Sequence, residues 1–253
     1  MLRTRVIPCL QLLDGSLVKT VKFDKPAYIG DPINTVRIFN ELEVDELCLL
    51  DIRASAKGYP PNFELLQQIA NECFMPLSYG GGIDSFATAQ KIFSIGFEKI
   101  ILNTALHTKP QLIHELVAHF GSQAIVASID VKKNMWGKYM AYTNDGTQKI
   151  DADPVSLAQQ LQRQGVGEIL LTSIDRDGTW HGYDITITEK VATAVTIPVI
   201  AYGGAGSVKD IETVIKTGRA SAAALGSMVV YQKQGMGVLV NFPDKKMLDV
   251  TLM

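Results

Sequence analysis

Short apolar runs alternate with amphipathic stretches along the whole chain. In the amphipathic stretches, such as residues 110–121 and 207–218, apolar side chains recur every three or four positions, which is typical of a helix packed by one face. The apolar runs, which we interpret as strands, cover residues 6–10, 47–50, 76–79, 100–102, 125–129, 169–172, 198–202 and 222–225. Eight strand–helix units in 253 residues predict the α/β class and a closed (β/α)8 barrel, or TIM barrel.

A doubly wound open sheet would produce the same alternation, but no G-x-G-x-x-G motif follows the first predicted strand. One insertion interrupts the pattern after the fifth strand. Residues 135–150 combine β-forming side chains with Asn144, Asp145 and Gly146, which favour a tight turn. The insertion therefore predicts a small hairpin.

The second half of the chain repeats features of the first half in the same order. The matched positions are Asp51 with Asp175, Tyr79 with Tyr202, Asn103 and Thr104 with Gly226 and Ser227, and Gln11 with Asp130. The offsets all lie between 119 and 124 residues, which indicates a duplication. We therefore predict that residues 1–253 form a single barrel domain built from two duplicated half-barrels, about 1–122 and 123–253.

The charge balance and the apolar runs exclude several classes of function. With 24 basic and 26 acidic residues, the formal charge is -2, which leaves no basic surplus for binding nucleic acid. No stretch approaches the ~20 apolar residues of a membrane span, and the N-terminal sequence lacks signal-peptide features, so we expect a cytoplasmic protein. The spacing of Cys9, Cys48 and Cys73 favours reduced thiols over a disulfide framework, and the sequence contains no recognisable metal site.

Glycines cluster where two pairs of predicted strands end, at the face of a (β/α)8 barrel that carries the active site. Residues 80–82 would lie near Asn103 and Thr104, and residues 203–204 near Gly226 and Ser227. Glycine lets a phosphate approach the backbone, and a helix N-terminus adds a favourable partial charge. The pattern predicts two phosphate sites and a substrate with a phosphate at both ends. The alternative is that these glycines only form tight turns.

Several segments together resemble one protein family. They are RVIPCLQLLDGSLVKTVKF, LLDIRASAKG, YGGGI, KIILNTA, ASIDVKK, EILLTSIDRDGTWHGYD and IAYGGAGS, spread from Arg3 to about Val230. These segments are similar to those of the cyclase subunit of imidazole glycerol phosphate synthase, the enzyme of histidine biosynthesis that receives ammonia from a partner glutaminase. The phosphoribosyl isomerase of the same pathway shares the fold and the half-repeat, but SIDRDGT, VIPCL and the flexible stretch after Lys19 favour the cyclase.

This resemblance implies a bisphosphorylated ribulosyl-formimino aminoimidazole substrate and no organic cofactor. One phosphate is expected near Gly82, Asn103 and Thr104. The other is expected near Asp177, Gly178, Gly204, Gly226 and Ser227. By the same resemblance, Lys19 lies on a mobile loop over the substrate.

The resemblance also implies two carboxylates that transfer protons, at the ends of the first and fifth strands. Ring closure and cleavage require protons to move at two places on an extended substrate. Asp130 matches the second position, but Gln11 occupies the first. An amide can orient a group by hydrogen bonding but cannot act as a general acid or base at neutral pH. The departure at Gln11 therefore argues against the standard cyclase reaction.

Four charged residues of alternating sign stand at the starts of predicted strands: Arg5, Glu46, Lys99 and Glu168. Each alone would be a solvated strand-start charge. The resemblance implies instead a salt-bridged gate through which ammonia from the docked glutaminase enters the barrel. An apolar barrel core would keep ammonia away from water and unprotonated, and the candidates to line it are Val6, Cys48, Leu50, Ile101 and Ile129.

Three functions remain open at this point. The first is a working cyclase. The second is a paralogue, resembling cyclase-like proteins associated with surface-polysaccharide genes, that supplies ammonia for an acetamidino sugar. The third is a non-catalytic ammonia conduit for the glutaminase. Gln11 favours the second, as does the C-terminal sequence, where Gly235, Gly237 and Pro243 interrupt the final helix that the family usually forms after Tyr231.

Overall fold

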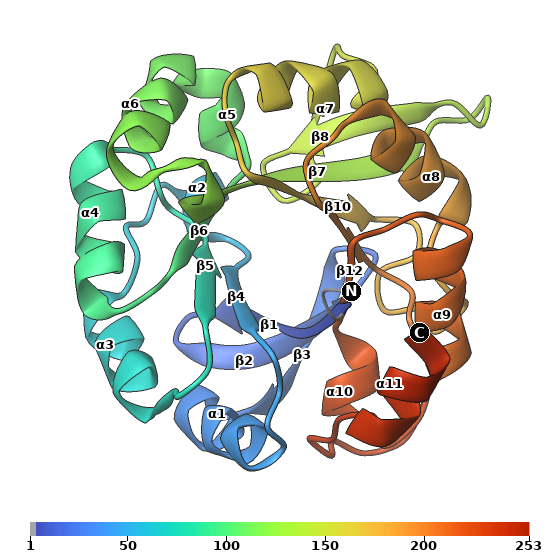
Figure 1. The fold of residues 1–253 in the computed structure, drawn as a ribbon. Helices are drawn as coiled ribbons and strands as arrows, with labels where there is room; N and C mark the ends of the chain where they lie inside the picture. The colour runs from blue at the N-terminus through green and yellow to red at the C-terminus, as the bar shows by residue number, and fades with distance from the viewer. Residues whose placement is uncertain (1–3, 253) are drawn as a thin grey trace.

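The computed structural model describes residues 4–252 of the chain. Within them, eight parallel strands close into a barrel surrounded by helices, which confirms the predicted fold (Figure 1). The strands are β1 (Arg5–Leu13), β4 (Leu47–Asp51), β5 (Leu77–Gly80), β6 (Lys99–Leu102), β7 (Ile125–Lys133), β10 (Glu168–Ser173), β11 (Val199–Tyr202) and β12 (Ala222–Leu225). Each pairs with the next along the chain, and β12 pairs with β1 to close the ring.

Helices cover the outside of the barrel between successive strands. The longer ones are α1 (Pro32–Glu41), α3 (Phe63–Glu72), α4 (Phe86–Ile95), α6 (Pro110–Phe120), α7 (Pro154–Arg163), α8 (Ile185–Ala194) and α9 (Val208–Lys216). The side chains of Asp31, Ser85, Asp153 and Ser207 cap helix N-termini by accepting backbone N–H groups. Each helix buries one apolar face, and each fully buried Val, Leu, Ile or Phe side chain contributes roughly 1.5–3 kcal/mol.

We call the end of the barrel where the parallel strands have their carboxyl ends the mouth. Shorter helices follow three of the strands there. They are α2 (Ala54–Lys57) after β4, α5 (Thr104–Thr108) after β6 and α10 (Ser227–Val230) after β12. A 3-10 turn, η1 (Ser122–Ala124), leads into β7. These short helices place the start of a helix close to the end of a strand at three points around the mouth.

A small apolar core fills the inside of the barrel. Its members include Ile7, Cys9, Cys48, Ile101, Val126, Leu170, Ile200 and Ala224. The free thiols Cys9 and Cys48 lie side by side, with their Sγ atoms 3.4 Å apart. Next to them is an interior cavity of about 10 Å³, which is close to the minimum volume that one water-sized molecule requires.

Two of the residues expected to line this interior face the other way. Val6 and Ile129 belong to the larger core between the strands and the helices. The expectation was wrong for them because side chains alternate across a strand, so that their neighbours Ile7 and Ser128 point inward instead. Cys48 and Ile101 do line the interior cavity.

Two antiparallel hairpins extend the barrel at its mouth. β2 (Ser16–Val21) and β3 (Asp24–Gly30) follow β1, and β8 (Tyr139–Thr143) and β9 (Gln148–Ile150) follow β7. The β8–β9 hairpin confirms the prediction for residues 135–150. The β2–β3 hairpin corrects the expectation that Lys19 lies on a loop, because Lys19 lies buried in β2 and the residues after it form a paired strand.

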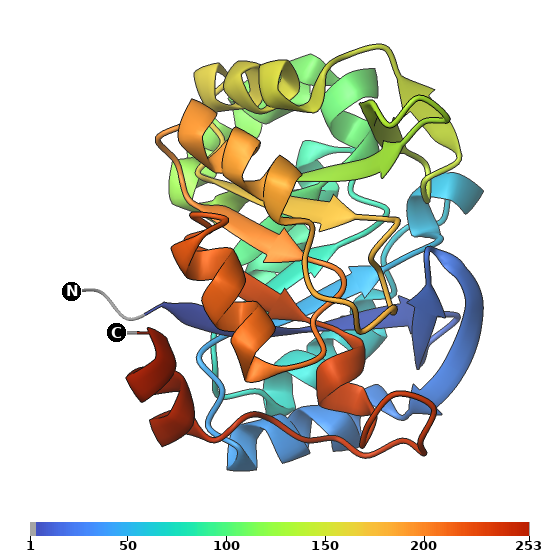
Figure 2. The same cartoon turned by 90° about the vertical axis from the view of Figure 1, so that its right-hand side faces the viewer.

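The last helix of the described residues is α11 (Lys245–Leu252), which begins just after Pro243 and packs against α9. The preceding residues 231–244 are irregular apart from a bridge between Tyr231 and Val238, as the β-rich run GVLVNFP indicates. Figure 2 shows α11 at the end of the barrel where the strands begin, opposite the two hairpins. Among residues 4–252, no helix has the length and apolar character needed to cross a membrane.

Candidate functional site

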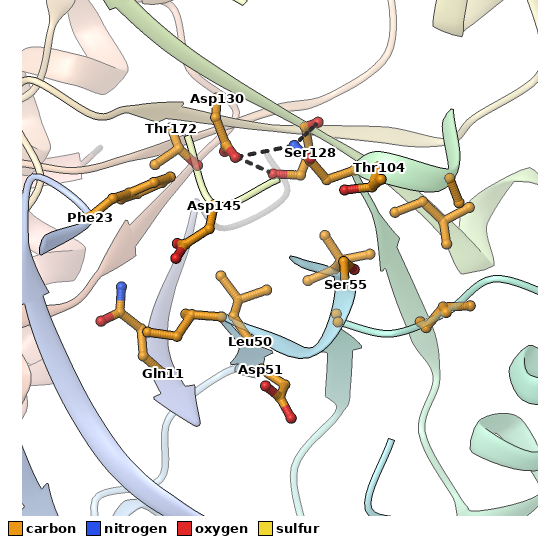
Figure 3. A pocket seen from close by; sticks show the side chains of 18 of the residues that line it. Gln11, Phe23, Leu50, Asp51, Ser55, Thr104, Ser128, Asp130, Asp145 and Thr172 are labelled. Carbon is orange, nitrogen blue, oxygen red and sulfur yellow. Dashed lines mark hydrogen bonds between the residues drawn. The ribbon is translucent and has the colours of Figure 1, made fainter. Parts of the chain in front are cut away.

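A cavity of about 100 Å³ opens at the carboxyl ends of the parallel strands, and we call it the central cavity (Figure 3). The residues that line it include Gln11, Thr20, Phe23, Leu50, Asp51, Ser55, Ile101, Asn103, Thr104, Ser128, Asp130, Asp145, Thr172 and Tyr202. The structure thus brings the predicted residues Gln11, Asn103, Thr104 and Asp130 to one place. In the described part of the chain, no group of three or more His, Cys, Asp or Glu side chains could hold a metal ion.

Asp130 is a buried carboxylate on β7 at the wall of the central cavity. Ser128 Oγ donates to its Oδ1 at 3.3 Å, and Asn103 Nδ2 donates to its Oδ2 at 3.1 Å. Removal from water raises the pKa of Asp130 to about 7, in spite of hydrogen bonds that lower it. The negative charge of Asp145 raises this pKa further. A carboxyl group with such a pKa can both give and take a proton near neutral pH.

Gln11 is buried on β1 with its side-chain oxygen fully engaged. Gln11 Oε1 accepts hydrogen bonds from Thr20 N at 2.9 Å and from Thr20 Oγ1 at 3.1 Å. In Figure 3 its amide nitrogen faces the central cavity. The nearby Asp14 does not substitute for a carboxylate here, because it lies in the exposed turn after β1, with its Oδ1 3.6 Å from Lys57 Nζ.

The first predicted phosphate position lies beside the central cavity. Gly82 and Thr104 border an adjoining cavity of about 290 Å³, together with Ser55 and Lys109. Gly82 N donates to Ser55 Oγ at 3.2 Å, and Thr104 is the first residue of α5. This cavity offers space, a helix start and a cation, and its role as a phosphate site stays a prediction.

The residues predicted for the second phosphate position meet around another cavity, of about 10 Å³. They are Asp177, Gly178, Gly204, Gly226 and Ser227, with Lys19 beside them. Lys19 Nζ lies 2.6 Å from Asp177 Oδ1, and Thr20 Oγ1 donates to Asp177 Oδ2 at 2.9 Å. A larger cavity of about 470 Å³ adjoins this one and shares Lys19, Gly178 and Ser227 with it. The binding role of this group also stays a prediction.

Backbone packing alone already requires several of the glycines. A Cβ atom would lie 2.4 Å from Asp51 O at Gly81, 2.5 Å from Tyr59 O at Gly82 and 2.2 Å from the carbonyl oxygen of Gly182 at Gly204. All three glycines also have positive φ. The tight-turn alternative therefore explains these residues without any phosphate.

At the opposite end of the barrel, the four predicted gate residues form a closed ring of ion pairs. Arg5 Nη1 lies 2.7 Å from Glu46 Oε2, and Arg5 Nη2 lies 2.5 Å from Glu168 Oε1. Lys99 Nζ lies 3.2 Å from Glu46 Oε1 and 3.0 Å from Glu168 Oε2. Burial lowers the pKa of Arg5, but the two glutamates outweigh this effect and raise it overall. Glu46 also borders the interior cavity, so the ring closes the apolar interior at the end of the barrel where the strands begin.

The structure adds lining residues that the sequence did not single out as functional. Thr20, Phe23, Asp145 and Thr172 all face the central cavity. Asp145 was predicted only as a turn residue, and burial raises its pKa to about 6 against the lowering effect of Arg53. A turn signal does not reveal what the hairpin folds over, so the local sequence could not place Asp145 in the site.

The fold and the site together define a (β/α)8-barrel protein with a polar cavity at the carboxyl ends of its strands. The sequence profile described as "Histidine biosynthesis protein" matches residues 5–235. The chain therefore belongs to the histidine biosynthesis protein family, in agreement with the resemblance to the cyclase subunit.

Individual relatives cover nearly the whole chain. "Putative imidazole glycerol phosphate synthase subunit hisF2" of Pseudomonas aeruginosa is 50% identical over 99% of this chain and 100% of its own length. "Putative imidazole glycerol phosphate synthase subunit hisF3" of Vibrio vulnificus is 44% identical over 96% of this chain and 94% of its own. "Imidazole glycerol phosphate synthase subunit HisF" of Prochlorococcus marinus is 39% identical over 99% and 98%, respectively.

Proposed function

We propose that the chain is the cyclase-type subunit of an imidazole glycerol phosphate synthase and uses ammonia delivered by a partner glutaminase. The carrying observation is the arrangement along the barrel. The ion-pair ring borders the apolar interior through Glu46, and Ile101 borders both the interior cavity and the central cavity that contains Asp130. Ammonia that entered at the ring would reach Asp130 without contact with bulk water, and so would keep its nucleophilic lone pair.

The substrate of this reaction is a bisphosphorylated ribulosyl-formimino aminoimidazole. Ammonia condenses with the ketone of the ribulosyl arm, and one water molecule leaves. The new nitrogen then bonds to the formimino carbon, and the C–N bond to the aminoimidazole carboxamide ribotide breaks. This closes the ring of imidazole glycerol phosphate, with Asp130 in reach to move a proton. The two phosphates would occupy the cavities beside Gly82 and beside Gly204, which adjoin the central cavity.

The test supplies the purified chain with an ammonium salt and the bisphosphorylated substrate. We expect turnover to imidazole glycerol phosphate, and an Asp130→Asn variant should lose it by roughly a hundredfold to ten-thousandfold. An inactive chain that becomes active through Gln11→Asp would instead show that the missing carboxylate blocks the standard reaction. Absence of turnover by the unaltered chain would contradict the proposal, whether or not Gln11→Asp restores activity.

A second candidate function is favoured by Gln11. Its side-chain oxygen is engaged by Thr20, and an amide cannot exchange protons as the family aspartate does. The chain would then be a paralogue that delivers ammonia to a different acceptor, in the synthesis of an acetamidino sugar, with a third, ATP-using protein. A chain that binds a glutaminase and carries its ammonia to such an acceptor, but leaves the ribulosyl substrate unchanged, would support this function.

A non-catalytic conduit is the remaining alternative, and a binding experiment separates all three functions from a stand-alone isomerase. We expect a glutaminase of the HisH type to co-purify with the chain. A conduit would stimulate this glutaminase without any turnover of its own. Failure to bind any glutaminase would contradict the proposed ammonia route.

A further inference from the structure

Asp145 projects into the central cavity from the turn between β8 and β9. Figure 3 shows it in the space between Asp130 and Gln11, and all three residues line the same cavity. Among residues 4–252, no group forms a hydrogen bond or an ion pair with the carboxylate of Asp145. A partly buried carboxylate with no fixed partner remains available to a ligand in the cavity.

The turn that carries Asp145 is held over the mouth by the surrounding structure. β8 pairs with β7 in a register that sets Tyr142 opposite Asp130, so the turn begins two residues beyond the partner of Asp130. Thr143 Oγ1 donates to Thr104 Oγ1 at 2.8 Å. Asp145 itself has a φ of 57°, and a Cβ atom at Gly146 would lie 3.1 Å from Phe23 Cδ2. The β7–β8 pairing and the hydrogen bond between Thr143 and Thr104 hold the strand that leads into this turn.

Two other carboxylates near the central cavity, Asp51 and Asp177, already have polar partners. Asp51 Oδ1 accepts the backbone N–H of Ala54 at 3.2 Å. Asp177 forms a buried ion pair with Lys19. Of the carboxylates that line the central cavity in the described part of the chain, only Asp130 and Asp145 are free of such backbone caps and ion pairs.

The charge of Asp145 also acts on Asp130. The charge of Asp145 raises the pKa of Asp130, which is about 7. Burial raises the pKa of Asp145 to about 6, and Arg53, from the start of α2, lowers it. Because the pKa of Asp130 lies above that of Asp145, Asp130 is the carboxyl group that keeps its proton when only one of the two is ionised, so the site can offer a base and an acid at the same time.

We propose that Asp145 is the second proton-transferring carboxylate of the site and takes the role that Gln11 cannot perform. This inference rests on the proposed cyclase function. Asp145 accepts the proton from the nitrogen that closes the ring, while protonated Asp130 gives its proton to the amine nitrogen that leaves with the aminoimidazole. Each carboxyl group ends in the other's initial state, and exchange with water restores both.

The test compares Asp145→Asn with the unaltered chain in the ammonium-dependent reaction. Asparagine has the same shape and tolerates positive φ, so the turn should persist. We expect kcat to fall roughly a hundredfold to ten-thousandfold and the lower limb of the pH profile of kcat to disappear. The remaining limb, due to Asp130, should move to lower pH because a neighbouring negative charge is gone. Lys149→Ala, which removes an exposed side chain from β9 of the same hairpin, is the matched control and should leave kcat unchanged.

The outcomes separate this inference from the proposed function. Turnover by the unaltered chain with an unchanged pH profile in Asp145→Asn would overturn the role of Asp145 alone. Absence of turnover in the unaltered chain would overturn the proposed function and this inference with it. Equal losses in Asp145→Asn and Lys149→Ala, with both pH limbs retained, would show that the hairpin only shapes the cavity.

Discussion

At the scale of single residues, the buried carboxylate of Asp130 lowers the free energy of unfolding by an amount that depends on pH. The pKa of Asp130 is about 7 in the folded chain, and an aspartate in an unfolded chain has a pKa of about 3.9. The folded state therefore binds this proton more tightly, and the free energy of unfolding falls as the pH rises from about 4 to about 7. Burial of the charged form without an ion pair is the physical cause.

This linkage gives a prediction for Asp130→Asn. Between pH 5 and pH 8 the unaltered chain should lose roughly 2–3 kcal/mol at this residue, whereas the asparagine has no proton to lose. Urea unfolding at the two pH values measures the difference. We expect a clearly smaller pH effect in the variant. An equal pH effect in both proteins would mean that the Asp130 pKa is not raised by the fold.

Sequence reasoning could place Asp130 and Gln11 but not Asp145. The first two lie on apolar runs whose alternation and order indicate where each strand ends. Asp145 is defined by a turn, and only the register of β8 against β7 brings that turn over the mouth. The ion pair between Lys19 and Asp177 was hidden for the same reason, since its two partners come from opposite halves of the chain.

At the scale of elements, the turn that joins β5 to α4 depends on close backbone approach. Gly81 has a φ of 122°, and a Cβ atom there would lie 2.4 Å from Asp51 O. Gly96, the C-cap of α4, has a φ of 117° with nothing within 4 Å of the same added atom. The two glycines thus have a similar positive φ but differ in their surroundings.

Alanine substitutions at these two glycines should therefore have different costs. We expect Gly96→Ala to destabilise the chain by roughly 1–2 kcal/mol through backbone conformation alone. Gly81→Ala should cost roughly 2–4 kcal/mol, because β4 and β5 must also move apart. Thermal or urea unfolding of both variants measures the difference. Equal losses would show that the Asp51 contact relaxes freely.

The elements differ in how well the sequence predicts them. The barrel strands are short, apolar and regularly spaced, so each predicted run overlaps an observed strand. The β2–β3 hairpin has few apolar residues on β3 and depends on distant contacts, such as the hydrogen bond that Lys22 N donates to Asp177 O. Local sequence patterns do not contain such contacts, and this part of the mouth was therefore misjudged.

At the scale of the whole molecule, two groups of charged residues lie at opposite ends of the barrel. The end where the strands begin holds the ring of ion pairs, which is formally neutral with two cations and two carboxylates. The end where the strands finish holds the central cavity with Asp130 and Asp145. The apolar interior between them separates the two charged ends, and under the proposed function ammonia would cross it. Function on the proposed ammonia route therefore depends on the closure of the ring as well as on the site.

Lys99→Met tests this dependence. The variant keeps the aliphatic stem but leaves Glu46 and Glu168 to share Arg5, so the ring carries a net negative charge that attracts water and cations. With a glutaminase bound, we expect the glutamine-driven rate to fall relative to the ammonium-driven rate by roughly 2- to 30-fold, equivalent to 0.5–2 kcal/mol of lost coupling. Arg37→Ala, which breaks an exposed ion pair with Glu72 on the outer helices, should leave that ratio unchanged. The ratio of the two rates is the decisive measurement, because a general loss of stability lowers both rates together. A ratio in Lys99→Met that matches the unaltered complex would mean that ammonia does not pass the ring.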